Sequence, residues 1–457
     1  MISLSERSWT SWALRIIYIR GGKVKLREFL EYLDSKGDLI KVKREVDCNI
    51  ELAKVASAFD GQAILFEKVK GYDIPVVINV NSSRELVAEA LEVKKEQILK
   101  TILSAMEKPK EAEILKKGAC QEVVEKHVDL DALPIPKYLP NDGGRYLTCA
   151  LVIVNDPENG RNMCYHRLMQ ISKNSFVARI IPRRGTDTAL KNAGGELDVA
   201  IAVGNATNVM IAAATSIAKD EDELSMANAI EETPLVKCKT VDVEVPADAE
   251  FIFEGRIIDE EADEGPFLDL TGTYDIVRKQ PVIEIKKITH RKKPYMQALL
   301  PGKNEHKILM GMPREPTIYK EVSKVCKCKN VLISPGGCSW LHGIVQIAKQ
   351  REDDGKRAIE AAFRGHTSMK HCVVVDEDID IYNPYDVEWA IATRFQAHRD
   401  LVIMEKQKGS SLDPSRYEVD DIHYTTKVGV DATIPFDKSK KDFIRTDYET
   451  VKKEDYI

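Results

Sequence analysis

Polar side chains that could take part in catalysis gather near the middle of the sequence. Asn162, Cys164 and His166 alternate along one short segment, which places them on one face of a β-strand. Arg161 and Arg167 fall on the other face if the alternation is strict. Because the net charge of the chain is −6, any anion that it binds must be held by a local group of basic residues such as these.

Acidic side chains follow at two further places. Glu221 and Glu223 open an expected helix, and Glu264 and Asp269 lie in an expected turn around a Gly-Pro pair. Taken singly, each group has an ordinary explanation, because acids favour helix N-termini and arginines on strands form surface salt bridges. The sequence lacks the phosphate loop, the dinucleotide fingerprint, the H-E-x-x-H zinc motif and the G-x-S-x-G elbow. These absences disfavour ATP-driven chemistry, nicotinamide hydride transfer and serine hydrolysis.

Length and composition indicate a soluble globular protein. A chain of 457 residues exceeds one ordinary core, and its 43% hydrophobic and 31% charged residues are typical of a folded protein. The mixed charges predict no nucleic-acid partner and no membrane surface, and no apolar run approaches the ~20 residues of a spanning helix. Nine scattered cysteines, with only Cys326 and Cys328 close together, indicate a cytoplasmic protein rather than a zinc or disulfide framework. Residues 1–23 are expected to be a non-essential extension.

Periodicity predicts an N-terminal α/β domain over residues 24–125. Apolar residues from Leu26 to Leu33 follow helical spacing, and Gly37 is placed to end that helix. Ser82 and Glu85 predict a capping box at the start of another helix. The other expected elements are a helix at 50–59 and strands at 39–46, 64–66 and 75–80.

A Pro/Gly-rich connector leads into a mostly antiparallel β-domain over 126–300, followed by a second α/β domain over 301–457. Strands are expected at 146–155, 175–181, 197–203, 236–245, 250–258 and 282–288, with one helix at 221–230. In the last domain we expect helices at 317–325, 343–349 and 356–363, and strands at 331–334 and 373–376. The polar tail after Gly409 is expected to pack on a neighbouring subunit.

The polar residues together resemble the UbiD family of decarboxylases. The pattern N-x-x-x-x-R, an acid about 60 positions later, and E-G-P-[FY]-x-[DE] occur as Asn162 with Arg167, Glu223, and Glu264 with Asp269. Further ordered matches extend from Leu26 almost to the end of the chain. The resemblance implies an N-terminal α/β domain, a central split β-barrel that binds the flavin, and a C-terminal α/β domain.

The resemblance also implies the cofactor and the catalytic roles. The cofactor is prenylated FMN, supplied by a separate flavin prenyltransferase, and the family forms homodimers or larger homo-oligomers. Arg167 is expected to hold the substrate carboxylate and to pair with Glu264, and Asp269 is expected to protonate the substrate after CO2 leaves. The implied cofactor-binding residues are Asn162, Cys164, Tyr165, His166, Arg167, Arg183, Arg184, Ser216 and Lys370.

A metal is expected between the flavin phosphate and the protein. Asn162 and Glu223 match the family's ligands, and oxygen ligands suit Mn²⁺ or Mg²⁺, with K⁺ often nearby. The family's third ligand is commonly a histidine, but Arg183 occupies that position here. Arginine cannot bind a cation, although it pairs directly with phosphate, so either fewer protein ligands hold the metal or Arg183 partly replaces it.

The segment around Arg167 is similar to an archaeal branch of the family, which indicates the substrate. That branch converts trans-anhydromevalonate 5-phosphate to isopentenyl phosphate. Its second anionic group requires further basic residues, and the candidates are Arg179, Arg184, Lys303, His306 and Arg314. The alternatives are decarboxylation of an aromatic acid such as a 4-hydroxybenzoate derivative, a flavin-binding protein without this activity, and a metal-dependent hydrolase.

Overall fold

The structure is a computed structural model that describes residues 25–420 and 422–446. The chain forms two compact units, the first ending at Pro313 and the second beginning at Arg314. The expected extension, residues 1–23, lies outside the described residues. Among the helices of the described residues, none is long and apolar enough to cross a membrane.

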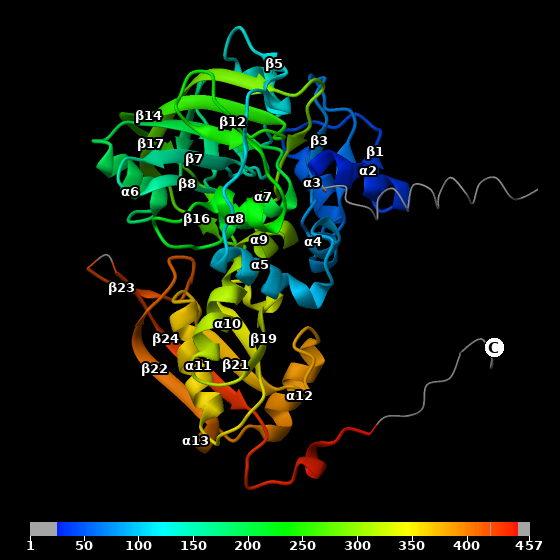
Figure 1. Cartoon of the computed structure of the whole chain (residues 1–457), viewed down its shortest axis with the longest axis vertical. Helices are drawn as coiled ribbons and strands as arrows, with labels where there is room; N and C mark the ends of the chain where they lie inside the picture. Colours follow the sequence, from blue (N-terminus) through cyan, green and yellow to red (C-terminus); the bar gives the residue numbers. More distant parts are fainter. Residues whose placement is uncertain (1–24, 421, 447–457) are drawn as a thin grey trace, which may run out of the picture. The chain divides into compact units, whose positions relative to one another are not determined.

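A small sheet covered on both faces opens the first unit (Figure 1). Its order is β1-β2-β3-β18, and only the β2–β3 pair is antiparallel. Leu65 and Val77 pack in one cluster with the apolar face of α2, whereas Ile64 and Ile78 pack on the opposite side with α3. The elements are α2 (Leu26–Lys36), β1 (Ile40–Val42), α3 (Glu51–Ala58), β2 (Ile64–Phe66), β3 (Val76–Ile78), α4 (Arg84–Ala90), α5 (Ile98–Glu107) and β18 (Met296–Gln297).

The sequence predicted how helix α2 ends and how helix α4 begins. Helix α2 ends as expected at Gly37, whose φ of 79° is left-handed and therefore suits glycine. The expected capping box at Ser82 is wrong by one residue, because the Oγ of Ser83 accepts the N–H of Leu86 at 3.0 Å and caps α4. The hydroxyl of Ser82 instead donates to the carbonyl of Asn79.

An antiparallel sheet of nine strands forms the middle of the first unit (Figure 1). Its order is β6-β9-β10-β17-β14-β11-β7-β8, with β5 added to β17. Strand β11 is buried along most of its length, because alternate residues such as Ile201 and Ala202 enter different core clusters on the two faces. The strands are β5 (Val123–Val124), β6 (Tyr146–Leu147), β7 (Leu151–Asp156), β8 (Gly160–Tyr165), β9 (Leu168–Gln170), β10 (Ser175–Ala178), β11 (Leu197–Val203), β14 (Phe251–Glu264) and β17 (Arg278–His290).

Several expected strands in this region differ in extent. The expected strand at 146–155 is two strands, β6 and β7, and that at 236–245 is also two, β12 (Leu235–Lys237) and β13 (Glu244–Pro246). Strands β14 and β17 run well beyond the expected 250–258 and 282–288, because each pairs with the other across polar, half-exposed residues that lack an alternating pattern. Glu264 therefore ends strand β14 and does not lie in a turn.

Four helices and three short strands complete the first unit. Helix α8 was expected, whereas α6, α7 and α9 were not. Helix α7 is buried on all sides and therefore has no polar face to show helical spacing. The elements are β4 (Ile114–Leu115), α6 (Gly185–Asn192), α7 (Thr207–Ala214), α8 (Glu223–Ile230), β15 (Phe267–Leu268), β16 (Tyr274–Asp275) and α9 (Asn304–Gly311). Strands β15 and β16 form a hairpin that carries the Asp269 turn.

The second unit is a mixed sheet with helices, in the order β19-β20-β21-β24-β22, and β23 pairs with β24. The expected helix at 343–349 is wrong: this segment is strand β20, whose apolar residues pair with β19 and β21. Part of the expected tail, residues 422–432, lies within the sheet as β24. The elements are α10 (Glu315–Ser323), β19 (Cys328–Ile333), β20 (His342–Ile347), α11 (Asp354–Gly365), β21 (His371–Asp376), α12 (Pro384–Arg394), α13 (Ala397–Asp400), β22 (Leu401–Lys408), β23 (Tyr417–Val419) and β24 (Ile422–Ala432).

Candidate active site

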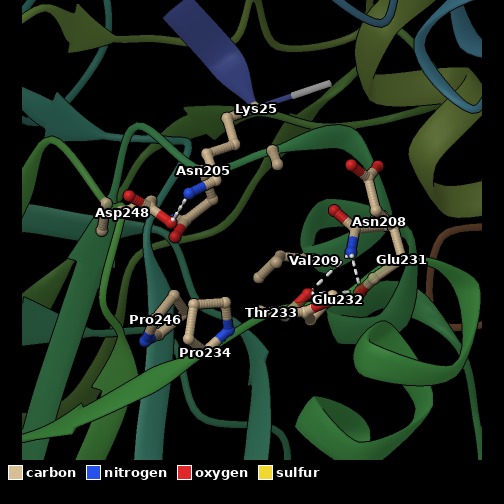
Figure 2. A pocket seen from close by; sticks show the side chains of 12 residues that line it. Lys25, Asn205, Asn208, Val209, Glu231, Glu232, Thr233, Pro234, Pro246 and Asp248 are labelled. Carbon is tan, nitrogen blue, oxygen red and sulfur yellow. Dashed lines mark hydrogen bonds and ion pairs between the residues drawn. The ribbon is translucent and has the colours of Figure 1, made fainter. Parts of the chain in front are cut away.

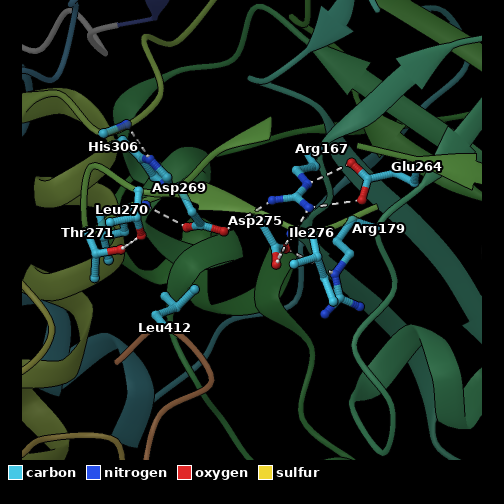
Figure 3. Close-up of polar contacts among 12 residues, drawn as sticks. Arg167, Arg179, Glu264, Asp269, Leu270, Thr271, Asp275, Ile276, His306 and Leu412 are labelled. Carbon is cyan, nitrogen blue, oxygen red and sulfur yellow. Dashed lines mark hydrogen bonds and ion pairs between the residues drawn. The ribbon is translucent and has the colours of Figure 1, made fainter. Parts of the chain in front are cut away.

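Arg167 is the centre of a group of carboxylates, drawn in Figure 3. It lies between β8 and β9 and makes two parallel hydrogen bonds of 2.9 Å, from Nε and Nη2, to the two oxygens of Glu264. Its Nη1 donates to Asp269 at 3.1 Å, and Nη2 also donates to Asp275 at 2.8 Å. We call Arg167, Glu264, Asp269 and Asp275 the arginine–carboxylate cluster. The fold thus joins the three residues that the sequence predicted as catalytic.

Glu264 is the fully buried member of this cluster. Its side chain has no exposed surface, and it also accepts a hydrogen bond from the hydroxyl of Tyr146 at 3.2 Å. The ring of Phe267 lies against Tyr146 and under the guanidinium of Arg167. A buried carboxylate needs such partners, so Glu264 fixes both the position and the charge of Arg167.

Asp269 is held in the hairpin between β15 and β16. Its Oδ1 accepts the N–H of Leu270 at 2.6 Å, which leaves Oδ2 to meet Arg167. Next to it lies His306 of α9, whose Nδ1 accepts the N–H of Gly302 at 3.0 Å. Burial lowers the pKa of His306, and the charge of Arg167 lowers it further against the opposing effect of Asp269. His306 is therefore a neutral imidazole beside the predicted acid.

Asp275 was not predicted from the sequence. Burial opposes ionisation of Asp275, but its hydrogen bonds and charge interactions with Arg278 and Arg167 outweigh burial and hold its pKa well below the usual range. Nothing in the sequence marks this residue, since it lies six positions beyond the recognised motif. Only its short distance to Arg167 identifies Asp275 as a member of the cluster.

Asn162 of β8 and Glu223 at the start of α8 form a second polar group. The Nδ2 of Asn162 donates to Glu223 at 3.1 Å, and the backbone N–H of Met163 donates to the second carboxylate oxygen at 2.8 Å. Burial raises the pKa of Glu223 to about 8, which is the behaviour of a carboxylate buried without a cation. Within the described residues, the Oδ1 of Asn162 is buried and has no hydrogen-bond partner.

These two side chains fit a divalent cation with oxygen ligands. A cation would satisfy the Asn162 oxygen and restore the charge of Glu223. The described part of the chain holds no group of three or more His, Cys, Asp or Glu residues with the geometry of a metal site. Asn162 and Glu223 are thus two oxygen-bearing side chains that could hold a cation here.

Helix α6 begins next to this pair. A side chain at Gly185 would meet the Oδ1 of Asn162 at 2.4 Å, so only glycine allows this approach. Thr186 hydrogen bonds to His166 Nε2 at 2.8 Å and lies 3.2 Å from the thiol of Cys164. Burial lowers the pKa of His166 to about 4 and raises that of Cys164. His166 is therefore neutral, and Cys164 is a packed thiol rather than a nucleophile.

The remaining predicted residues lie in different places. Arg183 and Arg184 are exposed just before α6, and the N–H of Arg183 donates to Asp187 at 2.6 Å. The hydroxyl of Tyr165 donates to the sulfur of Met210. Lys303 precedes α9 in the first unit. Ser216 follows α7 in the first unit, whereas Arg314 and Lys370 belong to the second unit, where Lys370 pairs with Asp413.

A separate cavity of about 30 Å³ lies around Asn205 (Figure 2). Within the described residues both polar side-chain atoms of Asn205 lack a hydrogen-bond partner. The space suits a water molecule and is far smaller than the several hundred Å³ of a typical cofactor site. None of the residues predicted for the site lines it, so it is not the reaction site.

Family models match three successive parts of the chain. Three models match in sequence order: the N-terminal, Rift-related and C-terminal domains of 3-octaprenyl-4-hydroxybenzoate carboxy-lyase, over residues 30–106, 112–304 and 307–432. The chain belongs to the UbiD family.

Two of the similar curated proteins are anhydromevalonate phosphate decarboxylases. The chain is 42% identical over 408 residues to an anhydromevalonate phosphate decarboxylase of Methanocaldococcus jannaschii, covering 88% of this chain and 95% of that protein. It is 42% identical over 413 residues to the enzyme of the same name from Methanosarcina mazei, covering 89% and 95%.

Solved structures are similar over almost the whole chain. The UbiD-class enzyme HmfF from Pelotomaculum thermopropionicum, in complex with FMN, is 37% identical with a TM-score of 0.90, covering 95% of this chain and 100% of that one. An evolved dimeric form of HmfF, in complex with prenylated FMN, is 36% identical with a TM-score of 0.86, covering 95% and 100%.

Proposed function

We propose that this protein decarboxylates an α,β-unsaturated acid with the help of prenylated FMN, converting trans-anhydromevalonate 5-phosphate to isopentenyl phosphate and CO2. The observation that carries the proposal is the bonding of Arg167 to both Glu264 and Asp269, in a chain 42% identical to an anhydromevalonate phosphate decarboxylase. Binding of a flavin alone would require none of these three side chains.

The protein residues supply orientation, charge and a proton. When bound, prenylated FMN supplies the electron sink that loss of CO2 from an sp² carbon requires. Arg167 binds the substrate carboxylate, and the buried Glu264 holds the guanidinium in place. The bond from the α-carbon to the carboxyl carbon breaks, and Asp269 delivers a proton to the α-carbon, where a C–H bond forms. One proton is consumed for each CO2 released.

The flavin phosphate would be held at the start of α6. Asn162 and Glu223 would bind Mn²⁺ or Mg²⁺ between them and the phosphate, and Arg183 would pair directly with the phosphate. The buried oxygen of Asn162, which has no hydrogen-bond partner among the described residues, supports this proposal. K⁺, Tyr165, Arg184 and Ser216 would belong to the same proposed site.

The proposed organisation follows the family. Residues 24–125 and 301–457 would be α/β domains, and the antiparallel sheet within 126–300 would be the split β-barrel around the flavin. The protein would form homodimers or larger homo-oligomers, receive its cofactor from a flavin prenyltransferase, and act in the cytoplasm. A relative described as dimeric supports the oligomeric state.

The test is CO2 release from trans-anhydromevalonate 5-phosphate by protein co-expressed with a flavin prenyltransferase. Wild-type protein should turn over this acid, and Asp269→Asn should bind the flavin but release no CO2. Glu261→Gln, a change at an exposed position of β14, is the matched control and should remain active. No release by flavin-loaded wild-type protein would refute the substrate, and the same assay with 4-hydroxybenzoate would then test the aromatic alternative.

A further inference from the structure

Two arginines beside the arginine–carboxylate cluster are placed there by strand register. The backbone N–H of Arg179 donates to the carbonyl of Arg167 at 3.1 Å, which continues the antiparallel pairing of β9 with β10. Arg278 pairs directly with Glu264 across β14 and β17. Residues directly opposite on an antiparallel pair share one face, so both arginines lie on the face of the cluster.

Asp275 is shared by three arginines, Arg167, Arg179 and Arg278. Its Oδ2 accepts hydrogen bonds from Arg167 at 2.8 Å and Arg278 at 2.5 Å. Its Oδ1 accepts a second bond from Arg278 at 2.8 Å and the N–H of Ile276 at 3.0 Å. With both oxygens engaged, Asp275 lies 3.8 Å from the Nε of Arg179, beyond hydrogen-bond distance.

Arg179 therefore shares Asp275 with two arginines that bind it more closely, and its own ion pair with Asp275 is 3.8 Å long. Its Nη1 donates to the carbonyl of Ile180, and within the described residues it makes no hydrogen bond to a carboxylate. Burial lowers the pKa of Arg179, and the charges of Arg278 and Arg167 lower it further, against the opposing effect of Asp275 and Glu264. Like charges placed opposite each other destabilise a sheet, so this arrangement has a cost that a bound anion would offset.

We infer that Arg179 and Arg278 form a subsite for a second anionic group of the substrate, a phosphate monoester. Their side chains remain 19% and 26% exposed, so a ligand can reach them. Two guanidinium groups match the oxygens of a phosphate dianion, which carries about −1.5 to −2 charges near pH 7. Figure 3 shows Arg179 extending past Asp275, away from Glu264.

The subsite explains how one site could select a short bifunctional acid. Arg167 and Arg179 both approach the same oxygen of Asp275, so the two guanidinium groups are neighbours. An acid with its carboxylate on Arg167 would carry its phosphate to Arg179 and Arg278 through only a few carbon atoms. This inference rests on the proposed function for the role of Arg167, and it singles out Arg179 from the basic residues that the sequence suggested, adding Arg278.

The test compares binding of two saturated acids that cannot react. Calorimetry would measure the affinity of wild-type protein, purified with its flavin, for 3-methyl-5-phosphonooxypentanoate and for 5-hydroxy-3-methylpentanoate, which lacks the phosphate. The same pair would be measured with Arg179→Gln, Arg278→Gln and the control Arg256→Gln, whose guanidinium forms surface ion pairs with Glu196 and Asp198. Flavin absorbance of each preparation would show whether the cofactor is retained.

We expect the wild-type protein to bind the phosphorylated acid more tightly than the hydroxy acid. Each subsite variant should reduce this ratio of affinities about 10- to 100-fold. Affinity for the hydroxy acid should stay the same, and Arg256→Gln should behave as wild type. An unchanged phosphate preference in both variants, with flavin retained, would overturn the inference. Loss of flavin in both would also overturn it, because the arginines would then serve the cofactor. A phosphate preference without CO2 release from the unsaturated acid would refute the proposed function alone.

Discussion

Removal of Arg167 should destabilise the protein mainly through Glu264. Glu264 has no exposed surface and loses two charge-assisted hydrogen bonds in an Arg167→Met variant, whereas Asp275 keeps Arg278 and Asp269 reaches solvent. An uncompensated buried carboxylate costs about 3–5 kcal/mol. Adding Glu264→Gln should recover most of this loss, because the neutral amide has the same shape and still accepts from Tyr146.

Urea unfolding followed by circular dichroism would give the free energy of unfolding of both single variants and of the double variant. The control Arg256→Met breaks only surface ion pairs and should cost no more than about 1 kcal/mol. If the double variant were as unstable as Arg167→Met, lost packing of the arginine would explain the effect, and the argument from buried charge would be refuted.

Three further predictions concern other buried or capping groups. Burial raises the pKa of Glu305 from 4.5 to about 7, so the protonated side chain stabilises the fold fully below pH 4.5, and this contribution is lost as the pH rises to about 7. Urea unfolding should therefore show that the wild type loses roughly 3 kcal/mol of unfolding free energy across this window relative to Glu305→Gln. Parallel pH profiles of the two proteins would contradict this prediction. Glu223→Gln should lower the divalent metal bound per chain in mass spectrometry, whereas the control Glu221→Gln, at a half-buried position where the carboxylate accepts the N–H of Ala218, should not. Equal metal contents would exclude Glu223 as a ligand. Ser83→Ala should lower the free energy of unfolding by about 1 kcal/mol through loss of the α4 cap, and no change would show that the cap is dispensable.

Local patterns predicted several elements with the right type and bounds. Strands β2 and β11 have the expected bounds, and α2 ends at Gly37 as expected. Strand β20 was mistaken for a helix because its short apolar run has no period that separates a buried strand from a buried helix. Its neighbours β19 and β21, which the local sequence does not contain, decide the conformation.

The amino-acid sequence by itself determined the family pattern and three members of the cluster. Arg167, Glu264 and Asp269 belong to recognisable motifs, because their chemical types and spacing recur together. The replacement of the family's histidine by Arg183 was equally visible, and the fold brings the two predicted ligands, Asn162 and Glu223, within hydrogen-bond distance.

Only the tertiary structure decided which other charges meet these residues. Asp275 and Arg278 lie outside any motif, and their role follows from the pairing of β14 with β17 and from the β15–β16 hairpin. The physical reason is that strand register sets which side chains share a face, and register depends on partners about 100 residues away, as Arg167 and Asp275 are. Sequence spacing gives the chemical groups, whereas cross-strand pairing determines their electrostatic environment.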